Sequence, residues 1–179
     1  MKKFKSLYLE KINPDLMKNF GLKNLHQTPK LLKITINRGL GIKAQNTKIL
    51  KSSVNEIRLI SGQAPNVTKS KKAIAGFKIR DDMELGIKIT LRGKKMYSFL
   101  DKLINLALPR IRDFRGLDPK KFDKNGNYNF GINDQLIFPE IEYESVDQTM
   151  GFDINFVTSA KNSMQGIALL KGLGIPFHN

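Results

Sequence analysis

Apolar residues spaced three or four positions apart predict four helices along the chain. The helical segments are residues 5–20, the stretch between Thr47 and Gly62, the stretch from Met96 to Ala107, and residues 162–171. Pro14 should break the first segment, Thr47 can cap the second, and Pro109 stops the third. The second and third segments present an apolar face that is expected to pack against a core, and the GLG at residues 172–174 should end the fourth.

Strict alternation of apolar and polar residues predicts two half-buried strands. Leu32, Ile34 and Ile36 alternate with Lys33, Thr35 and Asn37 in the first, and Leu85, Ile87, Ile89 and Leu91 alternate with Gly86, Lys88, Thr90 and Arg92 in the second. Weaker patterns predict strands near residues 128–132, 136–143 and 152–158, with a hairpin turn at the KNGN sequence of residues 124–127.

The order of these elements predicts a single α+β domain over residues 1–179. We expect an open, mostly antiparallel sheet with helices packed on one face and the other face free. Residues 63–83 are polar and basic without a clear period, and they predict a long loop.

The net charge of +15 is confined to the first two-thirds of the chain. Residues 1–120 contain 27 Lys and Arg against 9 Asp and Glu, whereas residues 121–179 contain 4 against 7. This asymmetry indicates a polyanionic partner such as nucleic acid, because charge that serves only solubility would be spread more evenly. No apolar run reaches the ~20 residues of a membrane helix, so no membrane partner is expected.

The polar sides of the two best strands are candidates for a nucleic-acid interface. Lys33, Thr35 and Asn37 line one strand, and Lys88, Thr90 and Arg92 line the other. If the strands are neighbours, the cations would bind phosphates, and Thr and Asn would hydrogen-bond to phosphates, 2′-hydroxyls or base edges. An ordinary solvated sheet face alternates in the same way, so the pattern alone leaves both interpretations open.

Residues 68–80 are a second candidate, because they combine five cations with no acid. The cations are Lys69, Lys71, Lys72, Lys78 and Arg80, and Ala75, Gly76 and Phe77 lie between them. Small residues let a backbone approach phosphates closely, and an aromatic ring among cations can stack on a base. A mobile, solvated loop is the alternative.

A third basic cluster lies in residues 108–117, where Arg110, Arg112 and Arg115 surround the single acid Asp113. The planar guanidinium group suits bidentate contacts with phosphate. The same residues also fit an internal Arg–Asp clamp, and the sequence does not separate the two.

Residues that carry chemistry are scarce. The chain has no Cys, and His26 and His178 each stand apart from carboxylates in sequence. The residues Gly39 to Ala44 match the loose dinucleotide pattern G-x-G-x-x-A, but the acid expected about 20 residues later is missing. Glu140, Glu142 and Glu144 alternate along a predicted strand and suit a solvated or partner-facing surface better than a cation site. We therefore predict no enzymatic activity, no cofactor and no metal site.

Six longer segments stand out along the chain: ITINRGLG (34–41), SGQAPNVTKSKKAIAGFKIR (61–80), LGIKITLRG (85–93), LPRIRDFRGL (108–117), FDKNGNYNFGINDQLIFPEIEY (122–143) and GFDINFVTSAK (151–161). In order and spacing, they closely resemble the bacterial-type ribosomal protein five of the large subunit. They cover nearly the whole chain, so the resemblance is far more specific than any single motif.

The resemblance implies a structural constituent of the large ribosomal subunit that binds 5S rRNA in the central protuberance. Family residues important for that contact match Asn37, Gln63 and Thr90, of which Gln63 lies outside both predicted strands. The basic loop, about residues 70–83, would contact P-site tRNA. Its sequence Asp81-Asp82-Met83-Glu84 is more acidic than the family pattern.

The resemblance also implies partners for the remaining surfaces. The region around Arg110–Gly116 and the hairpin after Asn125 would form an intersubunit bridge with a protein of the small-subunit head. Other expected partners are large-subunit rRNA and neighbouring central-protuberance proteins. The basic part, about residues 1–120, would face 5S rRNA and tRNA, and the weakly acidic residues 121–179 would face proteins.

Composition and the start of the chain bear on its origin. Lys outnumbers Arg 24 to 7, which fits an AT-rich genome such as that of a plastid or a low-GC bacterium. The first residues lack the apolar stretch of a secretory signal and the acid-poor character of a transit peptide. We expect an organelle-encoded protein of the plastid (chloroplast) ribosome, with the bacterial cytoplasm as the alternative.

Overall fold

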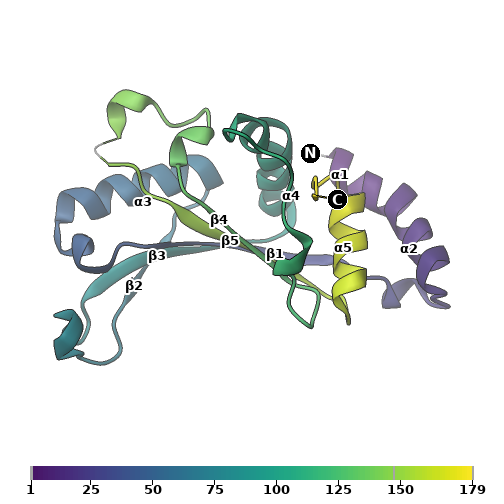
Figure 1. Ribbon diagram of the computed structural model, residues 1–179, viewed down its shortest axis with the longest axis horizontal. Coiled ribbons are helices and arrows are strands. Elements are labelled where there is room, and N and C mark those ends of the chain that lie inside the picture. Colours follow the sequence, from purple (N-terminus) through teal and green to yellow (C-terminus); the bar gives the residue numbers. More distant parts are fainter. Residues whose placement is uncertain (1, 147, 179) are drawn as a thin grey trace. The chain divides into compact units, whose positions relative to one another are not determined.

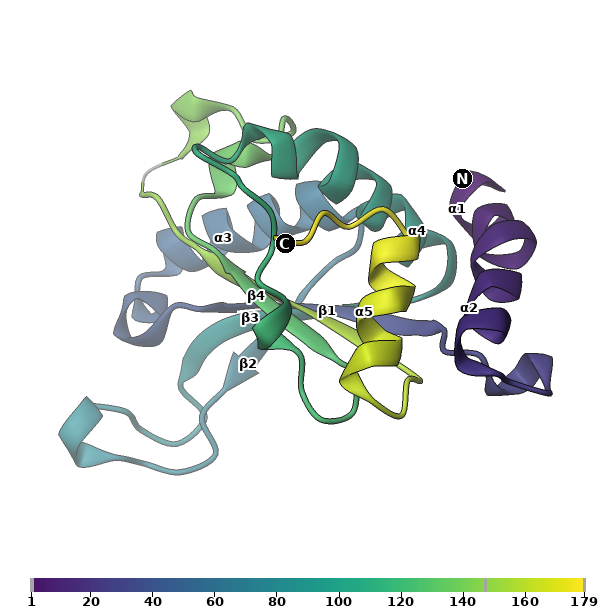
Figure 2. The ribbon, with the colours of Figure 1, turned by 45° about the vertical axis from the view of Figure 1, so that its right-hand side comes forward.

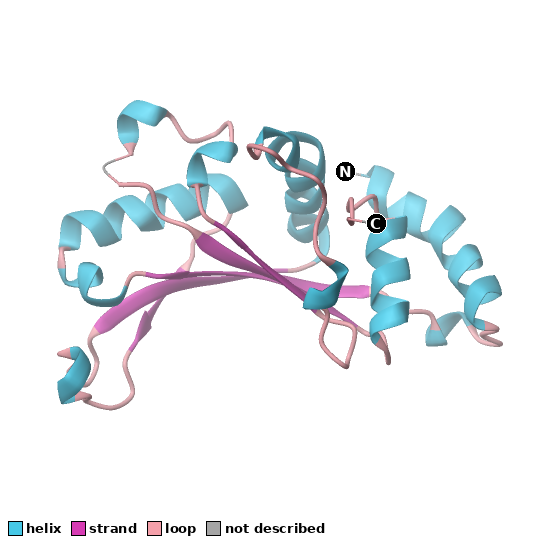
Figure 3. Ribbon diagram, viewed as in Figure 1, coloured by secondary structure: helices cyan, strands magenta, loops and turns pink. Residues whose placement is uncertain are grey.

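The computed structural model describes residues 2–146 and 148–178, which form an α+β fold (Figure 1). The helices are α1 (Lys2–Leu7), α2 (Asn13–Phe20), α3 (Thr47–Ser61), α4 (Gly93–Lys102) and α5 (Ser163–Gly172); the strands are β1 (Leu31–Gly39), β2 (Asn66–Lys69), β3 (Glu84–Leu91), β4 (Tyr128–Ile132) and β5 (Phe152–Thr158). The strands form one antiparallel sheet in the order β2-β3-β1-β5-β4 (Figure 3). The predicted α+β class and open antiparallel sheet are confirmed.

Contacts divide the chain into two compact units, each assembled from separate segments. The first unit contains the residues up to Ile34, Leu91–Phe130 and the residues from Asn155 on; the second contains Thr35–Thr90 and Gly131–Ile154. None of the described helices is both long enough and apolar enough to cross a bilayer.

In the second unit, α3 covers one side of its strands, and the β2–β3 loop extends on the other side (Figure 1). The core between helix and strands contains Leu40, Leu50 and Ile87, with Val54 and Val67 packed against it. The helix cap differs from the prediction. The Asn46 side chain accepts the N–H of Lys48 at 3.0 Å, so Asn46 caps α3 and Thr47 is already helical.

The first unit has an aromatic core. The rings of Phe130 and Phe156 stack with centroids 6.0 Å apart, and Phe122 and Phe177 surround Tyr128. The predicted break at Pro14 is wrong, because the backbone stays helical from α1 through a π-helical turn into α2. Pro14 is the second residue of α2, which directly follows that π-helical turn.

Two strand predictions are corrected by the structure. Residues 136–143 form a 3-10 turn and loop rather than a strand. Their apolar pattern reflects the burial of Ile137, Phe138 and Ile141 in a loop that the Gln135 amide holds through Met150 N–H and Gln148 O. At the start of β1, Leu32 is 44% exposed and Leu31 is the buried residue. The strands predicted at 128–132 and 152–158 and the helix at 162–171 are confirmed within one residue.

Candidate nucleic-acid interface

Strands β1 and β3 each present one apolar face to the core and one polar face away from it. Ile34, Ile36, Ile87 and Ile89 are buried, whereas Lys33, Thr35, Asn37 and Thr90 are half-exposed and Lys88 and Arg92 are exposed. The predicted alternation is therefore correct for the five polar candidates within the strands, whereas Arg92 lies one residue beyond β3, directly before α4. No described helix of the second unit covers the polar side of its strands (Figure 2).

The polar residues of the second unit lie in rows across β2, β3 and β1. Leu40 N–H donates to Leu85 O at 2.9 Å, and a Cβ on Gly86 would lie 3.5 Å from the Gly39 Cα. Continuing this antiparallel register places Asn37 opposite Lys88 and Thr35 opposite Thr90. On the other side of β3, Asn66 pairs with Lys88 and Thr68 with Gly86. One row thus consists of Asn66, Lys88 and Asn37.

Gln63 reaches this surface from the end of α3. Gly62 ends that helix in the left-handed conformation (φ 66°), with its N–H bonded to Arg58 O. The Gln63 side-chain amide donates to Thr90 O at 3.3 Å. The structure therefore brings together Asn37, Gln63, Lys88 and Thr90, all within the second unit. The strand patterns did not point to Gln63, and only the resemblance made it a candidate.

A hollow of about 560 Å³ lies between Gln63 and strands β2 and β3. Its polar lining consists of Gln63, Asn66, Thr68, Lys88 and Thr90. The sequence did not point to Asn66 and Thr68, because β2 is four residues long and too polar to show alternation. Both became candidates only when the pairing with β3 was known.

The β2–β3 loop is an ordered hairpin that extends from these two strands, rather than an irregular loop (Figure 2). Ile74 and Ile79 exchange backbone hydrogen bonds of 2.9 and 3.2 Å, and Ala75–Phe77 form a 3-10 turn between them. At its base, Ser70 N–H donates to Met83 O, and the Ser70 hydroxyl donates to Arg80 O. These bonds define the backbone of the segment at both ends.

The side chains predicted for this loop all face solvent. Lys71, Lys72, Ala75, Gly76, Phe77, Lys78 and Arg80 are exposed. Phe77 is 67% exposed at the tip, beside the partly exposed Ile74. The acids Asp81 and Asp82, which precede β3, are also exposed. An apolar tip flanked by cations suits stacking on a base together with phosphate contact.

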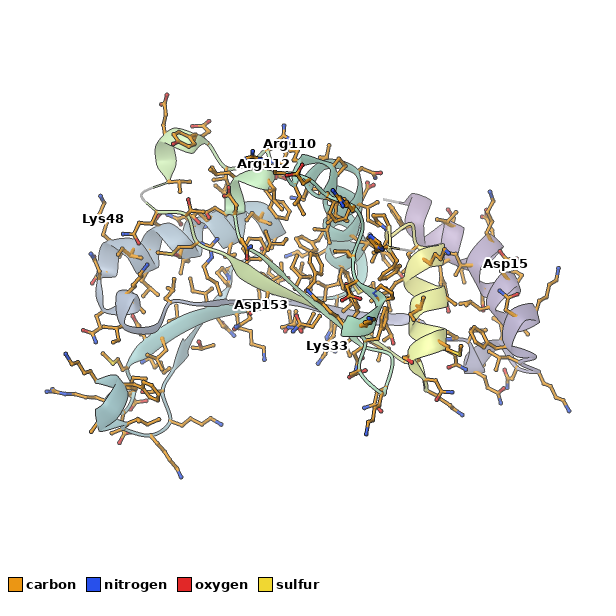
Figure 4. All side chains as sticks on the ribbon, in the orientation of Figure 1. Asp15, Lys33, Lys48, Arg110, Arg112 and Asp153 are labelled. Atoms are coloured by element: carbon orange, nitrogen blue, oxygen red, sulfur yellow. The ribbon has the colours of Figure 1, made fainter. Side chains whose placement is uncertain are left out.

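The arginine cluster in the first unit is exposed and is not an internal clamp. Arg110 and Arg112 follow the helical turns after α4 (Figure 4), and Arg115 is also exposed. The Arg112 Nε lies 3.8 Å from the Asp113 carboxylate, but the two side chains are 98% and 87% exposed. An ion pair so open to water contributes little stability, so the clamp interpretation is wrong.

The remaining sequence candidates do not form a catalytic site. Gly41 begins a separate 3-10 turn and α3 starts only at Thr47, so the glycines do not present a helix N-terminus to a phosphate. His26 and His178 are exposed. The segment that carries Glu140, Glu142 and Glu144 is not a strand. Within residues 2–146 and 148–178, no three acidic or His side chains are grouped to hold a metal ion.

The surroundings of two tyrosine hydroxyls in the first unit raise their pKa. Burial, with a smaller contribution from Tyr8, raises the pKa of Tyr97. Burial and the nearby Asp118 raise the pKa of Tyr128 to about 12, and its hydroxyl donates to Asp118 O at 3.1 Å. Both phenols stay protonated at neutral pH and serve packing.

Comparison with known proteins identifies similar chains over nearly the full length. The family model described as ribosomal protein L5 matches residues 24–80, and the model of the C-terminus of that ribosomal family matches residues 84–177. The large ribosomal subunit protein uL5 of Nostoc punctiforme is 59% identical over 177 residues, covering 99% of this chain and 97% of that protein. The uL5c proteins of Oltmannsiellopsis viridis (60% over 175 residues; 98% and 97% covered) and Gracilaria tenuistipitata (61% over 173 residues; 97% of each covered) are similarly close.

Proposed function

The chain belongs to the ribosomal protein L5 family, and on that premise we propose that its polar sheet face binds 5S rRNA in the central protuberance. Members of this family are structural, non-enzymatic constituents of the large ribosomal subunit that associate with rRNA, and this chain is one of them. The observation that carries the proposal is the 3.3 Å hydrogen bond from the Gln63 amide to Thr90 O, which places Gln63 beside the polar sheet face that carries Asn37 and Lys88.

The chemistry of this face suits structured RNA. The Asn37 amide and the Thr35 and Thr90 hydroxyls can pair with base edges and 2′-hydroxyls, while Lys88 can neutralise a phosphate. The apolar residues on the opposite side of the same strands are fixed in the core, so the polar groups are held in place before RNA arrives. Lys33 and Arg92 supply further cations from the first unit.

The two other basic segments have separate proposed partners. The hairpin extension, with Lys71, Lys72, Lys78 and Arg80 around Phe77, contacts P-site tRNA. Arg110, Arg112 and Arg115 contribute to an intersubunit bridge with a small-subunit head protein. Large-subunit rRNA and neighbouring central-protuberance proteins contact the remaining surface. Relatives in cyanobacteria and uL5c relatives are consistent with a plastid or bacterial ribosome, and we favour the plastid.

Asn37→Ala, Gln63→Ala and Thr90→Ala should each weaken 5S rRNA binding by about 1–3 kcal/mol, because each leaves an RNA group unpaired in a buried contact. Filter binding with 5S rRNA and with an unrelated hairpin of equal length measures the effect. Asn55→Ala, exposed on α3, is the control and should bind as the parent does. Losses below a few tenths of a kcal/mol for all three, or equal affinity for both RNAs, would contradict the proposed interface.

Charge reversal at Arg110→Glu together with Arg112→Glu should weaken subunit joining and leave 5S rRNA binding intact. Both side chains point into solvent, so their replacement costs little stability, and reversed charge repels an acidic partner surface. Sedimentation of reconstituted subunits measures joining. Joining at the parental level would remove the bridge assignment from these two residues.

A further inference from the structure

We propose that the hollow between β2 and β3 holds a single unpaired nucleotide of the bound RNA, with Asn66 and Thr68 contacting that nucleotide. This inference rests on the proposed binding of 5S rRNA to the sheet face. It adds a contact with an unstacked base, its ribose and its phosphate to the contacts proposed for Asn37, Gln63 and Thr90. Sequence-specific recognition of RNA mostly uses such splayed-out nucleotides, because paired bases hide their edges in a groove that side chains cannot read.

The size of the hollow fits one nucleotide. Its volume of about 560 Å³ lies in the range of sites that enclose a small ligand. It is bounded by Gln63 and by the paired strands, in which Asn66 stands opposite Lys88 and Thr68 opposite Gly86. Gly86 itself packs closely against its neighbours, since a Cβ there would lie 2.7 Å from Arg38 O and 3.2 Å from the Thr68 hydroxyl oxygen.

The polar groups in the hollow are complementary to the parts of a nucleotide. Lys88 is exposed and can pair with a phosphate. The Asn66 amide offers a donor and an acceptor side by side, the arrangement that reads a base edge. The Thr68 and Thr90 hydroxyls can each donate to or accept from a ribose. Within the described residues, the side chains of Asn66 and Thr68 make no hydrogen bond, so both are available to a ligand.

Pairing with β3 fixes Asn66 and Thr68 on the polar face. The Gln63 side-chain amide donates an N–H to Thr90 O, and the rest of this side chain lines one end of the hollow. Val67, between Asn66 and Thr68, points to the opposite side and packs against the core around Ile87. The two polar side chains are thus fixed on one side of a short strand whose other side is anchored.

The test combines substitutions in the protein with single abasic positions in the RNA. The paired variant Asn66→Ala with Thr68→Val should bind 5S rRNA about 10-fold more weakly than the parent. An abasic scan of the unpaired nucleotides of 5S rRNA should reveal one position whose base the parent protein needs to a similar degree. At that position the paired variant should show no further loss, because the contact is already absent. The control Thr47→Val with Asn55→Ala, on exposed α3 positions, should behave as the parent does at every abasic position.

The outcomes separate this inference from the proposed function. The nucleotide site is overturned if the paired variant binds 5S rRNA with the affinity of the parent. It is also overturned if the paired variant loses the same further affinity at every abasic position. Both results can occur while Asn37→Ala still weakens binding. Absence of specific 5S rRNA binding by the parent protein overturns both. The single variant Thr68→Ser keeps the hydroxyl and should bind 5S rRNA as the parent does. If Thr68→Ser and Thr68→Val lost the same binding affinity, the loss would come from a packing defect, and the inference would be overturned.

Discussion

Glu56→Ala should lower the free energy of unfolding by about 3–5 kcal/mol, a large share of the stability of a domain of this size. The Arg38 side chain is completely buried on the core side of β1, and its Nη1 donates to the Glu56 Oε2 at 2.6 Å. The guanidinium also lies 5.5 Å from the centre of the Phe152 ring. Loss of the carboxylate leaves a buried cation without a counter-charge, which is the costly way to break such a pair.

Urea unfolding followed by circular dichroism measures this loss. Arg58→Ala, exposed on the same helix, is the matched control and should change stability by less than about 0.5 kcal/mol. Arg38→Met together with Glu56→Leu should recover most of the stability, because an apolar pair of similar volume removes both buried charges. A cost below about 1 kcal/mol for Glu56→Ala would mean that the guanidinium finds other compensation and that the pair contributes little.

Sequence patterns reveal only one partner of the buried Arg38–Glu56 pair. The alternation of Ile34 and Ile36 extends to Arg38, which places a cation at a core position and indicates a buried counter-charge. The helix stripe of α3 does not include Glu56, so the partner could not be identified from sequence. It became visible only when the helix was packed on the strand. The same strand presents Asn37 on the opposite side, so the pair anchors the strand that carries a proposed RNA contact.

Strong periodicity made the central strands and helix α3 predictable, whereas short or irregular segments were not. β2 has four residues with only Val67 apolar, so its strand character comes from pairing with β3 rather than from its own pattern. Conversely, the apolar residues near Phe138 look like a strand but are buried in a loop held by the Gln135 amide. Local sequence thus located the polar sheet face, but the hollow at its edge depends on contacts between distant segments.

Raising the salt concentration from about 50 mM to about 200 mM should weaken 5S rRNA binding by about 10³-fold, the loss typical of a footprint of about six phosphates. The basic part of the chain has ample cations for such a footprint, since residues 1–120 contain 27 Lys and Arg against 9 acids. Each Lys–phosphate contact releases condensed counterions, and the gain from that release shrinks as salt rises. Binding that depends mainly on neutral hydrogen bonds would change far less.

Two sets of substitutions assign this salt dependence to a surface. Lys33→Gln, Lys88→Gln and Arg92→Gln together should lower the slope of log affinity against log salt by about one for each phosphate that is no longer neutralised. The matched set Lys71→Gln, Lys72→Gln and Lys78→Gln, on the hairpin extension, should leave the slope for 5S rRNA unchanged, because that surface is assigned to tRNA. A slope that falls equally for both sets would mean that 5S rRNA contacts the extension as well, and an unchanged slope for the sheet set would remove its cations from the interface.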